Sequence, residues 1–168
     1  EIVGPRLGEG AIIYDTLKTP EDLPRGWGDQ QSPGRYELHK RKDQAYFGYV
    51  IGPHSWKKYT HPPRKKLWSA KKTEGGGFEI EPPLENSQNQ TKKAFLGVRA
   101  CEQKAMEIFG KTYANSNEES PFVVAVNCTQ SASTCFCASM KTGPRVDSGY
   151  DLLLTEIVSQ SHYFVLEI

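Results

Sequence analysis

The chain has 168 residues, of which 37% are hydrophobic and 11% aromatic, so it can bury a core and is not disordered. Its 21 basic and 20 acidic residues leave a net charge of +1, which gives no general reason to expect nucleic acid or a membrane surface as partner. No apolar stretch approaches the roughly 20 residues that a membrane span needs, and the first residues lack the features of a secretory signal.

The lack of an initiator Met and the apolar C-terminal end predict a single domain, residues 1–168, cut from a longer chain. Its first part, residues 1–51, is expected to be rich in β-hairpins. Two apolar runs, 2–4 and 11–14, flank a Gly-containing connection and predict the first hairpin. Residues 16–34 contain many Pro and Gly residues and predict an ordered loop. A charged turn separates two alternating runs that predict a second hairpin, at 35–39 and 45–51.

The middle part, residues 52–93, is broken by Pro and Gly into short elements. A short helix is expected at 56–59, a second one at 63–69, and a brief strand at 78–81. Basic residues gather here, and they indicate either a solvated surface or a docking surface for an acidic partner protein. The residues of this candidate docking surface are Lys57, Lys58, Arg64, Lys65 and Lys66.

The third part, residues 94–168, changes to a strand, helix, strand pattern. Apolar runs at 94–100 and 122–126 flank a helical pattern at 101–109 that is expected to end at Gly110. This order predicts a βαβ unit with parallel strands. The apolar face of the helix is expected to consist of Ala105, Ile108 and Phe109. Two further strands are expected at 150–157 and 162–168. The predicted fold is therefore α+β, with N-terminal hairpins and a mixed sheet that contains the βαβ unit.

Four cysteines lie in this third part. Cys101 and Cys128 each follow one of the two parallel strands, and the carboxyl ends of such strands meet at the sheet edge where ligands bind. The loop after Cys128 is expected to bring Cys135 and Cys137 back over that edge. Two disulfides are disfavoured because the chain is large for a disulfide scaffold and Cys135 and Cys137 are too close to bridge easily. The sequence thus favours a reduced, cytoplasmic setting.

Four converging thiolates suit an iron–sulfur cluster, with [4Fe–4S] preferred to [2Fe–2S], and equally a structural zinc ion. Their spacing matches neither a zinc ribbon nor a bacterial ferredoxin. Neighbouring side chains are expected to hydrogen-bond to sulfur or to shield the site: Ser133, Thr134, Phe136 and Ser139. Inert, buried cysteines remain an alternative. A nucleophilic-cysteine enzyme is a further one, although no Cys–His signature is present.

Three segments, FLGVRACE at 95–102, AVNC at 125–128 and TCFCASMKTGP at 134–144, together resemble a known family. It is the N-terminal domain of hydrogenase and sulfhydrogenase beta subunits and of the corresponding electron-transfer subunit of anaerobic sulfite reductase. Further likeness lies at 52–59, 62–68 and 150–156. The sequence departs from the family pattern at Ser133 and Lys141, where Gly is usual.

The resemblance implies a non-catalytic electron-transfer subunit of an oxidoreductase complex, followed in the family by a ferredoxin-like domain with two [4Fe–4S] clusters. It implies as partners a hydrogenase or reductase catalytic subunit and a flavin-containing or nicotinamide-using subunit. The alternative function, from a different class, is a non-redox interaction domain whose cysteines bind zinc or nothing.

Overall fold

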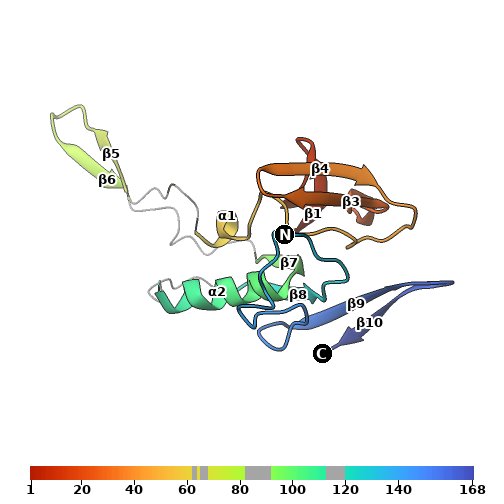
Figure 1. The fold of residues 1–168 in the computed structure, drawn as a ribbon. Helices are drawn as coiled ribbons and strands as arrows, with labels where there is room; N and C mark the ends of the chain where they lie inside the picture. The colour runs from red at the N-terminus through yellow and green to blue at the C-terminus, as the bar shows by residue number, and fades with distance from the viewer. Residues whose placement is uncertain (62–63, 65–67, 82–91, 113–119) are drawn as a thin grey trace.

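The computed structural model describes residues 1–61, 64, 68–81, 92–112 and 120–168 (Figure 1). Its main element is a six-stranded sheet with the strand order β10-β9-β8-β7-β1-β2. The strands are β1 (Ile2–Gly8), β2 (Ala11–Thr16), β7 (Ala94–Val98), β8 (Phe122–Val126), β9 (Leu152–Val158) and β10 (His162–Glu167). The four central strands run parallel, and β2 and β10 pair antiparallel at the two edges. The mixed sheet confirms the predicted α+β class.

The remaining elements are short, apart from one helix. They are the turn η1 (Pro20–Asp22), the hairpins β3 (Trp27–Ser32)–β4 (Arg35–Lys40) and β5 (Ser69–Lys72)–β6 (Phe78–Glu81), and the helices α1 (Lys57–Thr60) and α2 (Ala100–Thr112). The β5–β6 hairpin stands apart from the sheet, whereas α2 lies alongside it (Figure 1). Residues 1–51 supply β1 and β2 to the sheet that residues 94–168 complete.

The two faces of the sheet carry separate hydrophobic clusters. Ala125 and Val126 are neighbours on β8 but belong to different clusters, because successive residues of a strand point to opposite faces. One cluster consists mainly of Val3, Tyr14, Trp56, Phe95, Val98, Ala125 and Leu153, with Met106 of α2 against it. The other contains Ile12, Phe47, Tyr49 and Val126. The clusters cover both faces of the central strands, whereas the edge strand β10 is exposed on both, with Phe164 40% and Leu166 52% exposed.

The predicted hairpin of 35–39 with 45–51 is wrong. Arg35–Lys40 pairs instead with Trp27–Ser32, a segment that was expected to be loop. Pro33 and Gly34 form a two-residue turn between them, and Gly34 has a φ of 74° that favours glycine. Residues 45–51 contain no strand among the described elements. Their alternation places Phe47 and Tyr49 in the second cluster.

The backbone of this strand-like segment is held by buried carboxylates. Glu156 accepts hydrogen bonds from the backbone N–H groups of Tyr46 and Phe47 at 2.7 and 2.8 Å, and Asp29 accepts one from Val50 at 2.7 Å. Buried N–H groups need partners, and these carboxylates replace a neighbouring strand. The alternation of residues 45–51 therefore reflects burial of every second side chain and not pairing with a neighbouring strand.

The βαβ unit, the first hairpin, the strand at 78–81 and the two last strands are confirmed, with ends shifted by up to a few residues. The helix at 56–59 is also present, one residue later. By contrast, α2 runs through Gly110, and Ala105 and Ile108 lie on its exposed side, where Ile108 is 56% exposed. Its buried residues are Ala100 and Glu102. The expected helix at 63–69 lies largely outside the described residues, and Ser69 begins β5.

Candidate cysteine site

The parallel pairing of β7 with β8 brings Cys101 and Cys128 to one edge of the sheet. Cys101 is the second residue of α2, which a single residue separates from β7, and Cys128 follows the last residue of β8 by two positions. All four cysteines are free of disulfides. Cys101, Cys128 and Cys137 are partly buried, and Cys135 is exposed. Cys101 and Cys128 therefore follow the carboxyl ends of two neighbouring parallel strands, as expected.

Hydrogen bonds tie the cysteine loop, residues 128–146, back to its own start. The N–H of Cys128 donates to the carbonyl of Pro144 at 3.3 Å, and the N–H of Val146 donates to the Asn127 side chain at 2.9 Å. At Gly143, an added Cβ would lie 3.1 Å from the Cβ of Ala100 and 3.7 Å from the Sγ of Cys137. Gly143 therefore lets Cys137 approach the first turn of α2, which carries Cys101.

The thiols influence one another electrostatically. Burial raises the pKa of Cys101 to about 12, with further increases from the negative charges of Glu102, Cys128 and Cys137. Burial also raises the pKa of Cys128, while Arg99 opposes that shift and Cys137 and Cys135 add to it. Since a metal binds the thiolate, occupation of this site must release protons.

Arg99, which sequence reasoning missed as part of the site, is only 1% exposed and lies directly before α2, the helix that carries Cys101. Its guanidinium donates to the carbonyl oxygens of Asn127, Phe47 and Tyr49 at 3.1, 2.7 and 3.3 Å. Burial raises the pKa of Cys128, and the positive charge of Arg99 offsets part of that increase. Arg99 is therefore placed to balance negative charge on the thiolates. The only sequence signal was a charged residue inside an apolar run.

Glu102 is a second buried charged residue that the sequence analysis did not single out. Its carboxylate accepts hydrogen bonds from the backbone N–H of Arg99 and from the Tyr14 hydroxyl, both at 3.0 Å. Burial raises the pKa of Glu102 to about 7. The indole N–H of Trp56 lies close enough to lower that pKa but makes no hydrogen bond of normal geometry. These contacts fix the first turn of α2, and with it Cys101.

The side chains near Cys135 that were expected to bond to sulfur or to shield the site make other contacts or are exposed. The backbone N–H of Ala132 donates to the Sγ of Cys135 at 3.3 Å. Ser133 instead donates to the carbonyl of Gln31 at 3.1 Å, so its hydroxyl proton is directed to β3. Phe136 is 68% exposed, and most of its ring faces solvent. Thr134 and Ser139 are also exposed.

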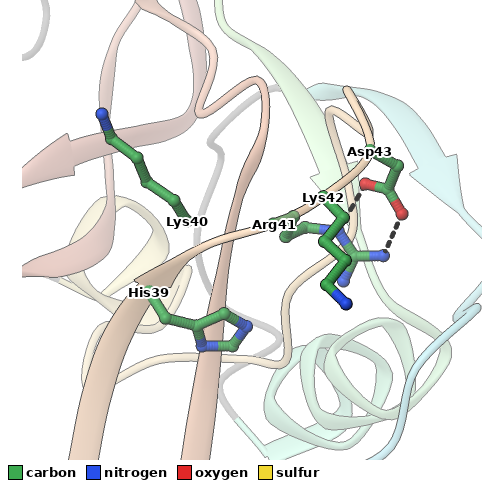
Figure 2. Close-up of a pocket in the computed structure, with 5 residues that line it drawn as sticks. All are labelled: His39, Lys40, Arg41, Lys42 and Asp43. Carbon is green, nitrogen blue, oxygen red and sulfur yellow. Dashed lines mark hydrogen bonds and ion pairs between the residues drawn. The ribbon is translucent and has the colours of Figure 1, made fainter.

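A hollow lies between the loop and the β3–β4 hairpin, and residues of both line it. The guanidinium of Arg41 donates to Gln130 at 2.6 Å, and Gln130 donates to the carbonyl of Asp29 at 3.3 Å. The hollow has a volume of about 430 Å³. A neighbouring one of about 300 Å³ is lined by residues 39–43, where Arg41 is held by two bonds to Asp43 (Figure 2). Arg41 thus anchors the cysteine loop to the hairpin.

The candidate docking surface is separate from the cysteines. The Nζ of Lys57 lies 4.8 Å from the centre of the Phe109 ring, near the end of α2, whereas Cys101 is at its start. Eight helical residues correspond to about 12 Å along the axis. Lys57, Lys58 and Arg64 are exposed, and Lys65 and Lys66 lie outside the described residues.

Within the described part of the chain, no three His, Cys, Asp or Glu side chains lie close enough together to hold a metal ion. None of the described helices is long and apolar enough to cross a membrane. No protein family, curated protein or solved structure matches the chain.

Proposed function

We propose that this chain is an iron–sulfur electron-transfer domain of a hydrogenase- or sulfite-reductase-type complex, with Cys101, Cys128, Cys135 and Cys137 as cluster ligands. The observation that carries the proposal is the approach of Cys101, Cys128 and Cys137 at the carboxyl edge of two parallel strands. Cys135 lies in the same loop and interacts with Cys128.

The donor set is four cysteines, which suits an iron–sulfur cluster and equally a structural zinc ion. The preference for the cluster rests on the family resemblance of segments 95–102, 125–128 and 134–144. When bound, the cluster would supply one-electron transfer.

The residues around the thiols have properties that a cluster site needs. The charge of Arg99 favours the thiolate form of Cys128. The Ala132 N–H bonded to Cys135 is the kind of donor that raises the reduction potential of a cluster. The buried contacts of Glu102 and Arg99 hold the first turn of α2 rigidly, which keeps Cys101 in place.

The partners in this proposal are a catalytic subunit and a flavin-containing or nicotinamide-using subunit, in the cytoplasm, and the chain itself catalyses no bond-making. They rest on the family resemblance of segments 95–102, 125–128 and 134–144.

The test is anaerobic reconstitution with iron and sulfide, followed by iron and sulfide analysis, absorbance and electron paramagnetic resonance. We expect four iron and four sulfide per chain for a [4Fe–4S] cluster, and reduced iron content in Cys137→Ser. Thr129→Ala, at an exposed residue of the same loop, is the control and should keep the full content. A chain purified anaerobically with one zinc and no chromophore would support the non-redox alternative and overturn this function.

A further inference from the structure

Two large apolar side chains of the cysteine loop face solvent. Phe136 is 68% exposed and Met140 is 62% exposed. The N–H of Met140 donates to the carbonyl of Phe136 at 3.1 Å, which is the bond of a helical turn. Residues four apart in such a turn lie on the same side, so the two side chains form one apolar surface. Phe136 stands between Cys135 and Cys137 in the chain, so this surface adjoins the thiols.

The residue after this turn has an unfavourable backbone conformation. Lys141 has a φ of 54°, in the left-handed region where glycine is the unstrained residue. Its N–H donates to the carbonyl of Ala138 at 3.2 Å, which fixes it at the end of the turn. Residues in such sparsely populated backbone conformations are found more often at functional sites than elsewhere. A lysine at this position places a positive charge beside Met140.

A positive charge follows the apolar pair directly in the chain, at Lys141. The connection between β8 and β9 also carries Arg145, Asp147 and Asp151, and the carboxylate of Asp151 accepts a hydrogen bond from the N–H of Val123 at 2.7 Å. Arg145 forms an ion pair of 3.1 Å with Glu167 on β10, which fixes its side of the loop to the sheet. An exposed apolar surface with positive charge at its border fits a partner that has an apolar recess with an acidic border.

We propose that Phe136, Met140 and Lys141 form a docking surface, here called the loop docking surface, for an acidic electron-transfer protein. That the partner carries electrons rests on the function proposed above; that it is acidic rests on the charge of Lys141 beside the apolar pair. Electron-transfer partners form interfaces at the small end of the range, in which complementary charge mainly raises the rate of association.

The test measures binding of the full chain to a purified acidic two-cluster [4Fe–4S] ferredoxin, at low and at physiological salt. Binding should weaken as salt increases, because exposed charges are screened. We expect Lys141→Glu, and separately Phe136→Ala with Met140→Ala, to weaken binding by about tenfold. Lys141→Gly should also weaken it while leaving the fold intact, because glycine removes the charge and accepts the backbone conformation.

The matched controls are Ile108→Ala, an exposed apolar residue on α2, and Lys58→Glu on the candidate docking surface. Both should bind the ferredoxin as the unchanged chain does. Loss of binding in Lys58→Glu but not in Lys141→Glu would overturn the proposal, as would absence of binding by the unchanged chain. A concentration-dependent dimer that the loop variants abolish would also overturn it.

Binding is measured with and without reconstituted iron, which separates the two proposals. A chain that binds ferredoxin through the loop docking surface but holds no iron would refute the electron-transfer function and retain the surface. A chain that holds its cluster but does not bind would refute the surface and retain the function.

Discussion

The guanidinium of Arg99 donates a hydrogen bond of 3.1 Å to the backbone carbonyl of Asn127, the residue directly before Cys128. Arg99 itself lies two residues before Cys101 and directly before α2. A single buried side chain therefore joins the two strand ends that carry these cysteines. The Arg99 guanidinium also donates to the carbonyls of Phe47 and Tyr49. It thereby links the two strand ends to residues 45–51, which cover the second face of the sheet.

Replacing Arg99 by Met should destabilise the protein by about 3 kcal/mol, because three buried carbonyl groups lose their donor. The pKa of the Cys128 thiol should rise as well, since the charge that lowers it is removed. Urea denaturation measures the first effect and the pH dependence of thiol alkylation the second. Arg35→Met, at an exposed ion pair, is the control and should lose less than about 1 kcal/mol. An equal loss in both variants would contradict the role given to Arg99.

Gly143→Ala should destabilise the cysteine loop by about 2 kcal/mol and lower its iron content after reconstitution. The new methyl group would lie 3.1 Å from Ala100 and close to the Cys137 thiol, at a φ of 153° that L residues rarely adopt. Gly10→Ala is the matched control, since its φ of 75° is also positive but no atom lies within 4 Å of the added Cβ. Strain alone should leave iron content unchanged, and a loss of iron in Gly10→Ala would show that the contact at Gly143 is not the cause.

Lys141→Gly should stabilise the chain by about 0.5–1 kcal/mol, because relief of the left-handed strain exceeds the added freedom of the unfolded chain. Ser139→Gly in the same turn lacks such strain, since Ser139 does not have a positive φ, and it should destabilise. Thermal and urea unfolding compare the two. If both substitutions destabilise equally, the backbone at Lys141 is not strained in solution.

Glu107 on α2 predicts a dependence of stability on acid pH. Ion pairs with Lys104 at 2.6 Å and Lys111 at 2.5 Å lower the pKa of Glu107 to about 2. A lowered pKa means that the folded chain binds the proton less readily than the unfolded one. The stabilising contribution is therefore complete above about pH 4.5 and is lost as the pH falls towards 2.

In the corresponding experiment, Glu107→Gln should be less stable than the unchanged chain at pH 6, and the difference should shrink by pH 3. High salt should also reduce it, because the three side chains are largely exposed. Urea midpoints at several pH values measure both trends. A difference that is constant with pH would show that the ion pairs do not form.

The sequence predicted the βαβ unit well because its signals are local. Apolar runs of strand length flank a helical pattern, and the rule for parallel strands places the residues after β7 and β8 at one edge. Cys101 and Cys128 could therefore be placed from spacing along the chain. The buried face of α2 could not, because Glu102 is buried through bonds with Tyr14 and Arg99 that no local pattern reveals.

The pairing of β3 with β4 was missed because the contacts that hold residues 45–51 are not local. Residues 45–51 show the alternation of a strand, but their N–H groups are bound by the distant carboxylates of Glu156 and Asp29. Periodicity reports which side chains are buried and does not say what the backbone bonds to. The Pro33–Gly34 turn was the local signal that could have identified the true hairpin.

By itself, the sequence determined the fold class, the parallel strand pair and the edge at which two of the cysteines emerge, since each follows from the order and spacing of local patterns. The tertiary structure alone decided that Cys137 approaches the start of α2, that Arg99 bonds to the residue before Cys128, and that Phe136 and Met140 face solvent. These features depend on contacts between segments far apart in the chain, and such contacts are set by packing and by the partners that buried polar groups require.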